Sequence, residues 1–209
     1  AGNAAELAAW LASNGNTGSA SDICSGFVTW THDYSSLTDD CGATGSTTVT
    51  FTATDDCNNS SSTTATFTIE DTTVPSIDGT ASDLTVECDG AGNSTELNDW
   101  LNANGGATAS DVCSGFVTWT HDFSSLSDDC GATGSTTVTF TATDDCYNSS
   151  STTATFTIID TTVPSIDAAA SDYIAECDGM GNMAELSDWL TTNGGAVASD
   201  ICSGFVTWT

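Results

Sequence analysis

The sequence predicts an all-β protein made of tandem β-sandwich modules, each with one short inserted helix. Three cysteines, Cys24, Cys113 and Cys202, follow one another at equal intervals of 89 residues (113 − 24 and 202 − 113). Within each period, short segments alternate apolar residues with threonine, which is the pattern of half-buried strands. A single segment per period shows helical periodicity instead. A period of this length suits one small β-domain.

Module boundaries are predicted at the segment "DTTVP", where a rigid proline follows β-branched residues. The chain then divides into an N-terminally truncated module, a complete module and a C-terminally truncated module, at 1–74, 75–163 and 164–209. The last segment, "ICSGFVTWT", stops in mid-strand, whereas the same pattern continues into further strands earlier in the chain. We therefore expect both ends to be the edges of a window on a longer array.

The complete module is expected to begin with a strand and a helix. In "SDLTVECD", apolar and polar residues alternate, which predicts the strand. Asn93-x-x-Glu96 has the form of a capping box, and apolar residues follow it at the spacing of one helical face. Asn104-Gly105 suits a left-handed helix end. The same helix signal recurs at Asn3/Glu6/Leu7/Trp10 and at Asn182/Glu185/Leu186/Trp189.

The rest of the module is predicted to form strands. "GFVTWTHD" is one strand, with Val117 and Trp119 on the same side. "STTVTFTATDD" and "STTATFTI" place apolar residues on one face and threonine on the other, and "DDCYNSSS" joins them as a hairpin loop. Two such inner faces predict a sandwich. Its core is small for its length, so disulfides contributing about 3 kcal/mol each would matter.

The charge balance excludes several partners. The chain has no Lys, no Arg and 29 acidic residues, which gives a formal net charge of −29. Nothing in it could neutralise a phosphate, so nucleic acid is not expected as a partner. No stretch is apolar enough to span a bilayer, so membrane insertion of this segment is not expected.

Cysteine usage predicts disulfides in an oxidising compartment, with four cysteines per period and hence two bridges per module. Zinc is disfavoured because no C-x-x-C spacing occurs. The cysteines predicted to bond are Cys24, Cys41, Cys57, Cys88, Cys113, Cys130, Cys146, Cys177 and Cys202. Four cysteines permit three pairings, and the sequence does not choose between them. We favour bonds within modules, namely Cys113–Cys130, Cys88–Cys146, Cys24–Cys41, and Cys57 with a cysteine ahead of Ala1.

Several motifs together resemble a known family. "LTVECDG", "CSGFVTWT", "CGATGSTTVTFTATDDC" and "DTTVP" are similar to the hyalin-repeat type of immunoglobulin-like module, in the form found in long secreted surface proteins of Bacteroidetes-type bacteria. The resemblance covers the whole chain. It implies tandem immunoglobulin-like sandwiches in an extracellular or cell-surface array, and no enzyme. The family usually has Gly directly after the cysteine that ends "TATDDC". In this chain, Asn58 and Tyr147 stand at that position.

A catalytic role is not expected from the residues either. Two adjacent pairs, His32-Asp33 and His121-Asp122, supply the residue types of a hydrolase. Adjacent residues on a strand point to opposite faces, so neither pair is expected to form a hydrogen-bonded dyad. An enzyme also tends to need one distinctive pocket, whereas this chain repeats one surface. We therefore predict that the chain is not an enzyme.

Clustered aspartates predict calcium binding. In a sandwich of this type, three Asp-bearing loops fall at the same end of each module. Two carboxylates about 4 Å apart repel by about 4 kcal/mol at an effective dielectric near 20, and no cationic side chain offsets this. Ca²⁺ would, because it accepts several oxygen ligands; the alternative is that these residues make turns and point into water. The candidate ligands are Asp22, Asp55, Asp56, Asp89, Asp111, Asp144, Asp145, Asp178 and Asp200.

The threonine-rich faces predict a surface that carries sugar, binds ice or is simply solvated. Solvation is favoured for any one threonine, and Thr72 and Thr161 are the first candidates for sugar, because "DTT" resembles the Asp-Thr-x acceptor sequence of Bacteroidetes-type O-glycosylation. Covalent glycans at these two residues are therefore predicted.

These observations together predict a structural repeat segment of a long extracellular or cell-surface filament, disulfide-bonded, stiffened by Ca²⁺ and glycosylated. Its partners would be neighbouring modules or copies of itself, since near-identical modules present the same contact to each neighbour. The stalk of a surface adhesin is the alternative function. A carbohydrate-binding module is less favoured because the tryptophans fall at core-facing positions.

Overall fold

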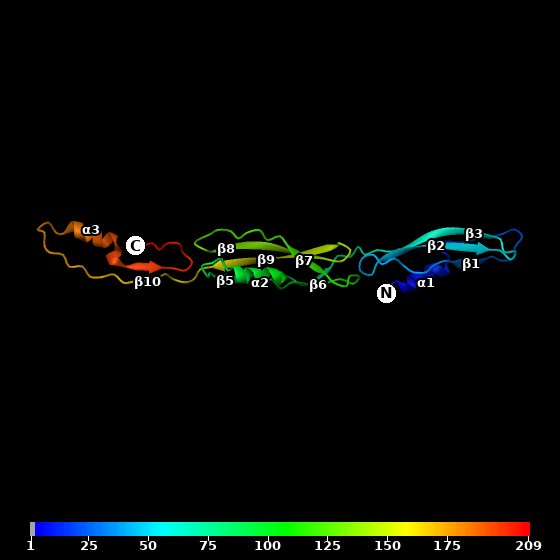
Figure 1. Ribbon diagram of the computed structural model, residues 1–209, viewed down its shortest axis with the longest axis horizontal. Coiled ribbons are helices and arrows are strands. Elements are labelled where there is room, and N and C mark those ends of the chain that lie inside the picture. Colours follow the sequence, from blue (N-terminus) through cyan, green and yellow to red (C-terminus); the bar gives the residue numbers. More distant parts are fainter. Residues whose placement is uncertain (1–2) are drawn as a thin grey trace. The chain divides into compact units, whose positions relative to one another are not determined.

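The computed structural model describes residues 3–209 (Figure 1). Within them, strands in four sheets make up most of the regular structure, and three short α-helices accompany them. The all-β prediction is confirmed at this level. Contacts between residues divide the chain into two compact units. The first comprises the chain up to Asp78, Ala109–Trp119 and Thr141–Ser150; the second comprises Gly79–Thr108, Thr120–Phe140 and Ser151–Thr209.

A three-stranded antiparallel sheet lies in the first unit. Its central strand is β2 (Gly45–Thr54), with β1 (Thr29–His32) on one side and β3 (Ser60–Ile69) on the other. Along β2, apolar side chains on one face are buried while threonines occupy the other, as the alternation predicts. Among residues 3–209, no strand pairs with the outer edge of β3.

A second sheet has four strands, in the order β5-β9-β8-β7. Their bounds are Leu84–Glu87 for β5, Ser149–Ile159 for β9, Gly134–Thr143 for β8 and Thr118–His121 for β7. Strand β5 is parallel to β9, with Leu84 opposite Phe156. The sequence of β8 is the same as that of β2, and so is its pattern of buried and exposed residues. The predicted hairpin between the two long strands is confirmed.

The remaining strands form two small sheets. They are β4 (Ser76–Gly79) with β6 (Thr108–Ser110), and β10 (Ser165–Ala168) with β11 (Val197–Ser199). The helices are α1 (Ala4–Ala12), α2 (Ser94–Asn102) and α3 (Met183–Thr191), with 3-10 turns at Asn104–Gly106 and Asn193–Gly195. The predicted helix in each period is therefore present.

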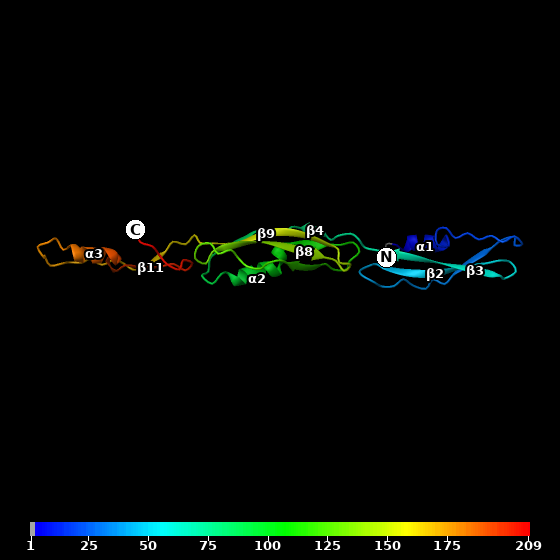
Figure 2. The same cartoon turned by 90° about the horizontal axis from the view of Figure 1, so that it is seen from above.

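Each of the first two helices covers an apolar sheet face. Figure 2 shows α2 lying along one side of β8 and β9. Trp100 of α2 meets Phe140 edge-on, with ring centroids 5.2 Å apart, and also contacts Phe156. Trp10 of α1 makes the equivalent contact with Phe51 at 5.3 Å. The core is thus a helix packed on a sheet, and the larger sandwich arrangement stays a prediction.

The predicted capping box at the start of α2 is wrong. Asn93 has a left-handed backbone (φ 48°), and its side chain makes no cap hydrogen bond to the helix. Its amide group donates instead to the carbonyl oxygen of Glu87, at 2.9 Å, while its own N–H donates to Asp89. Asn93 is only 2% exposed, so this short-range network fixes the turn between β5 and α2.

Two segments form less strand than their sequences predict. The segment "GFVTWTHD" is extended only from Thr118 to His121, because Phe116 ahead of it is 66% exposed and has no sheet neighbour. The segment "SDYIAECD" forms no strand, although its counterpart "SDLTVECD" forms β5. At the hairpin tips, Asn58 and Tyr147 take up the positive φ values of 66° and 68° that the family's usual glycine would adopt more easily.

Candidate functional site

Two disulfides join residues from successive 89-residue periods. Cys41 bonds Cys146, 105 residues along the chain, and Cys88 bonds Cys202, 114 residues along the chain. The predicted pairing of Cys88 with Cys146 is therefore wrong. The predicted Cys113–Cys130 and Cys24–Cys41 bonds are not formed either, because Cys24, Cys113 and Cys130 are free thiols. The bonds indicate an oxidising environment.

The pairing follows from how two loops dock in the first unit. The backbone N–H of Ala43 donates to the carbonyl oxygen of Cys113 at 2.8 Å. Gly42 lies so close to the same carbonyl that an added Cβ would be 2.5 Å from its oxygen, and its φ is +55°. Only glycine tolerates both conditions. The Cys41 turn is thereby held against a loop of the next period.

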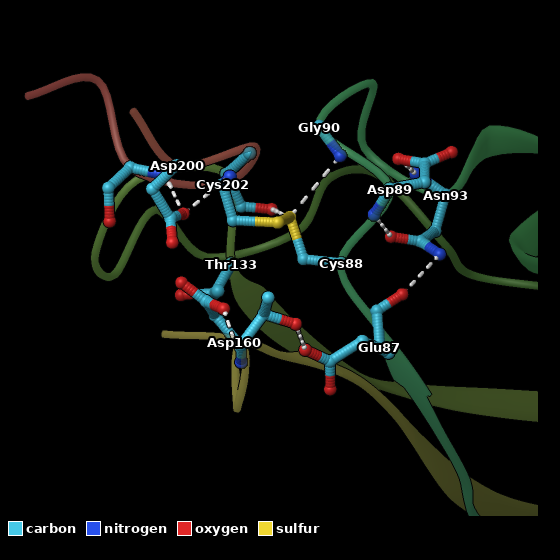
Figure 3. The surroundings of a disulfide bond; sticks show 12 residues. Glu87, Cys88, Asp89, Gly90, Asn93, Thr133, Asp160, Asp200 and Cys202 are labelled. Atoms are coloured by element: carbon cyan, nitrogen blue, oxygen red, sulfur yellow. Dashed lines mark hydrogen bonds between the residues drawn. A yellow bond between two sulfur atoms is a disulfide. The ribbon is translucent and has the colours of Figure 1, made fainter. Parts of the chain in front are cut away.

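The same docking recurs in the second unit, around the Cys88–Cys202 bond (Figure 3). The N–H of Ala132 donates to the carbonyl oxygen of Cys202 at 2.8 Å, and Gly131 has a φ of +60°. Cys88 and Cys202 are 8% and 5% exposed. The same kind of loop-to-turn contact therefore occurs inside each unit. A different disulfide stabilises it in each case.

Most of the predicted calcium ligands close turns of the backbone. In three loops, an aspartate accepts the N–H groups of the second and third residues after it, at 2.7 to 3.0 Å. These aspartates are Asp22, Asp111 and Asp200. At the hairpin tips, Asp55 and Asp144 each accept two backbone N–H groups and an Asn amide. Hydrogen bonds from Asn59 hold the pKa of Asp55 below its usual value.

The aspartates that follow "EC" also act within their own turns. Asp89 accepts the N–H groups of Ala91 and Asn93, at 2.7 and 3.0 Å, and Asp178 makes the equivalent pair of bonds. Donation from Asn93 and Ala91 lowers the pKa of Asp89. The hydroxyl group of Ser25 donates to the Asp56 carboxylate. The backbone N–H groups of Asp56 and Asp145 donate to the hydroxyl groups of Ser25 and Ser114, respectively. Turn formation, the alternative to calcium ligation, accounts for the contacts of Asp89 and Asp178, whereas those of Asp56 and Asp145 join two loops.

One group of side chains is arranged differently. Among the described residues, ligand atoms of Asp71, Asp111 and Cys113 lie within 4.8 Å of one another, and no other set of three His, Cys, Asp or Glu side chains does so. One carboxylate oxygen of Asp71 (Oδ2) is buried and has no hydrogen-bond partner. Burial, together with the charges of Asp71 and Asp111, raises the pKa of the Cys113 thiol. The buried Oδ2 of Asp71 thus lies near the Asp111 carboxylate without a donor of its own, although Asp111 accepts two backbone N–H groups.

Asp71 was not a predicted ligand, because the sequence presents it only as part of "DTT". The structure brings it to Asp111 through the contact between periods, which no local pattern reports. In the second unit, the equivalent Asp160 and Asp200 lie beside the Cys88–Cys202 bond (Figure 3). There Cys202 is disulfide-bonded to Cys88. Among the described residues, a free thiol beside two such aspartates is therefore found in the first unit alone.

The two predicted glycosylation sites are both exposed but differ in their hydrogen bonds. The hydroxyl group of Thr161 donates to Glu87 at 2.9 Å, and the N–H of Thr161 donates to the same carboxylate at 2.8 Å. These bonds lower the pKa of Glu87. Thr72 is exposed, and the hydroxyl group makes no hydrogen bond within the described part of the chain. Glycan attachment to Thr72 would therefore break no hydrogen bond, in contrast to attachment to Thr161.

The His-Asp pairs serve the strands. Asp33 accepts the N–H of Thr50 at 2.7 Å, and this bond lowers the pKa of Asp33. Asp122 does the same with Thr139. Both carboxylates therefore extend the edge pairing of a short strand, while the His32 ring lies 6.1 Å from the ring of Phe51.

No helix within residues 3–209 combines the length and apolar character needed to cross a bilayer. Comparison of the chain with protein-family models gives no match, and comparison with curated proteins gives no relative.

Proposed function

We propose that this chain is a structural repeat segment of an extracellular or cell-surface filament and that it has no enzymatic activity. The observation that carries the proposal is the pair of disulfides that join one period to the next. Bonds placed within modules would stabilise each module alone. Each bond lies inside one compact unit but joins chain from two successive periods, so a pull along the chain cannot draw these two stretches apart without breaking it, which is the requirement of a load-bearing array. The resemblance to hyalin-repeat modules supports the same function.

Electron microscopy of the purified chain, in parallel oxidised and reduced samples, tests this function. Filaments or end-to-end oligomers that shorten or disappear after reduction are the expected result. Monodisperse monomers under oxidising conditions at high concentration would contradict the proposal. The adhesin stalk is the alternative, and binding of labelled chains to host or bacterial surfaces, without self-association, would favour it.

A calcium site is proposed at Asp71 and Asp111 in the first unit. The unpartnered buried oxygen of Asp71 and the neighbouring carboxylate are hard oxygen ligands, and the chain has no Lys or Arg to compensate them. Cys113 is a soft ligand and is not expected to bind Ca²⁺. When bound, Ca²⁺ would supply positive charge between two segments of different periods. Apart from Asp56 and Asp145, the remaining predicted aspartates already serve as acceptors within turns.

Calcium is expected to stabilise the first unit. The effect of Asp71→Asn on the unfolding temperature is expected to change sign between Ca²⁺ and chelator. For a site with a Kd near 1 mM, 10 mM Ca²⁺ contributes about 1.4 kcal/mol. With Ca²⁺, the variant should unfold at a lower temperature than the parent chain. With chelator it should unfold at a higher temperature, because one of two facing charges is gone. Calorimetry measures both, and Asp160→Asn is the matched control. Equal responses of the two variants to Ca²⁺ would exclude this site.

Glycosylation is proposed on Thr72 ahead of Thr161. Both residues are exposed, but a glycan on Thr161 would cost the hydrogen bond to Glu87. Protein isolated from its natural source should have an intact mass above that of the polypeptide, and peptide mapping should place most of the added mass on Thr72. An unmodified Thr72 beside a modified Thr161 would show that the hydrogen bond to Glu87 does not decide the site.

A further inference from the structure

Strand β5 is short, and its apolar pattern fits β9 in two registers. Leu84 and Val86 of β5 face inward, and they lie opposite two buried residues of β9. These are Phe156 and Ile158. If β5 slipped by two residues toward the start of β9, Val86 would lie opposite Phe156 and Cys88 opposite Ile158. Apolar side chains would still meet apolar side chains, because the period of a strand is two. Apolar burial therefore does not decide between these registers.

Other slips are rejected by the sequence itself. A slip of two residues in the opposite direction would place Val86 opposite the charged side chain of Asp160. A slip of one residue would turn every inward side chain of β5 outward. The native register therefore has one competitor, the two-residue slip toward the start of β9.

The carboxylate of Glu87, the last residue of β5, separates these two registers. It accepts the N–H of Thr161 at 2.8 Å, the hydroxyl group of Thr161 at 2.9 Å and the hydroxyl group of Thr162 at 2.9 Å. In the slipped register, Ile159 and Asp160 would take the places of the two threonines. Both hydroxyl donors would be lost, and Glu87 would meet a second carboxylate. Glu87 is therefore satisfied in the native register and not in its competitor.

Three further contacts hold β5, and none of them favours the native register in the same way. The carboxylate of Asp83 accepts the N–H of Thr155 at 2.8 Å, and the residue two positions earlier in β9 is also a threonine with an N–H to offer. The N–H of Ala81 donates to the hydroxyl group of Thr152 at 3.2 Å, and a serine hydroxyl would replace it after the slip. Ser82 is bonded to α2 and the turn after it rather than to β9.

The register decides where Cys88 lies. Figure 3 shows the neighbouring side chains diverging, with Cys88 directed to Cys202 and Glu87 to the segment after β9. A two-residue slip would move Cys88 by about 6.6 Å along β9. The two Cα atoms already lie 6.1 Å apart, and bonded cysteines rarely exceed about 6.8 Å. The Cys202 loop would not follow, because the N–H of Ala132 holds its carbonyl oxygen at 2.8 Å. The slip would therefore separate the two sulfurs.

We propose that Glu87 sets the register of β5 on β9 and thereby selects Cys202 as the disulfide partner of Cys88. Glu87 is a positioning residue for this bond, because it acts through the strand and touches neither sulfur. Selection matters in a chain with nine cysteines, since each offers Cys88 an alternative partner. The bond lies inside the second unit, so the inference does not depend on the proposed filament function.

Oxidative refolding of the full chain in reduced and oxidised glutathione tests the selection. Oxidised glutathione gains two electrons for each protein disulfide formed and leaves as two thiols, while each of the two protein thiols loses a proton. Glu87→Ala is expected to raise the share of Cys88 bonded to other cysteines about tenfold, since one hydrogen bond to a charged group contributes roughly this factor. Mass mapping of non-reduced peptides measures the share. The Cys41–Cys146 bond of the first unit is the internal reference and should keep its yield.

The matched control is Asp83→Ala. It also removes a carboxylate that holds β5 to β9, but one that both registers satisfy, so Cys88 should stay with Cys202. Glu87→Gln keeps an acceptor oxygen and should restore part of the native pairing. Equal shares of misplaced Cys88 in the two alanine variants would mean that β5 is merely loosened, which would overturn the proposal. Native pairing in Glu87→Ala would overturn it as well.

A second arm reads the register directly, in chains with Cys88 and Cys202 replaced by serine. Thr85 lies opposite Thr157 in the native register, and both residues are on the outward face of the sheet. Oxidation should therefore cross-link Thr85→Cys to Thr157→Cys as long as Glu87 is present. In Glu87→Ala the cross-link should form instead between Thr85→Cys and Thr155→Cys.

The same arm is repeated with the donors changed in place of the acceptor. Thr161→Val combined with Thr162→Val removes both hydroxyl groups, preserves the shape of the side chains and leaves the carboxylate in position. The cross-link should shift in the same direction as in Glu87→Ala, so the result does not rest on the folding of a single variant. A cross-link that stays between positions 85 and 157 in both cases would show that Glu87 does not set the register.

Discussion

The chain with both Cys41 and Cys146 replaced by serine is expected to lose about 4 to 5 kcal/mol of unfolding free energy in its first unit. The bond closes a loop of 105 residues, and the entropy of such a loop in the unfolded chain gives this magnitude. Denaturant titration, followed by tryptophan fluorescence, measures the change. The slope of the transition should also rise, because the unfolded chain exposes more surface without the cross-link.

The matched control is the chain with Cys57 and Cys130 replaced by serine. These two residues stand one period away from Cys146 and Cys41, but both are exposed free thiols. Their replacement should change the unfolding free energy by less than about 0.5 kcal/mol. If the two double variants were equally stable, the Cys41–Cys146 bond would not hold the first unit together.

Trp100→Ala is expected to lower the unfolding free energy of the second unit by about 3 to 5 kcal/mol. The indole ring is 7% exposed and packs between α2 and two phenylalanines that are themselves fully buried. The indole N–H also donates to the carbonyl oxygen of Ser82 at 3.0 Å, so truncation leaves a cavity and an unpaired acceptor. Thermal or chemical unfolding followed by circular dichroism measures the loss.

Trp189→Ala separates packing from hydrogen bonding. Trp189 of α3 donates to Ser171 at 2.9 Å, as Trp100 does to Ser82, but α3 buries none of its residues. We expect this variant to lose less than about 1 kcal/mol, because no sheet covers the ring. A loss equal to that of Trp100→Ala would mean that the shared hydrogen bond, rather than burial, sets the effect.

Strands and helices were predictable wherever the pattern itself determines the structure. In β2 and β8 the alternation fixes which face is buried, because successive side chains point to opposite sides. The helices followed from apolar residues on one face, and Trp100 is indeed buried. The segment "YIAEC", Tyr173–Cys177, forms no strand although it is the counterpart of β5. It repeats β5 only in part, since Ile174 stands where β5 has Thr85, and among the described residues it has no neighbouring strand to pair with.

The disulfide pairing and the Asp71 site were beyond the reach of local patterns. The four cysteines of a period allow several pairings, and the loops that contact one another decide which pairing forms. Docking is decided by a glycine turn at Gly42 against the carbonyl group of Cys113. The same contact places Asp71 beside Asp111. A repeated sequence shows which residues are equivalent, but it does not show which period supplies the partner.

The two disulfides overlap along the chain, and this gives the segment from Cys41 to Cys202 an unusual tolerance of damage. One bond closes residues 41–146 and the other closes residues 88–202, so every peptide bond between Cys41 and Cys202 lies inside at least one covalent ring. A protease that cuts this stretch once leaves both fragments attached. A pulling force along the chain likewise passes through the disulfide and not through the loop that it closes. Roughly 350 Å of chain, at about 3.4 Å per residue, stays out of the path of a pulling force across the first ring until its sulfur–sulfur bond is reduced.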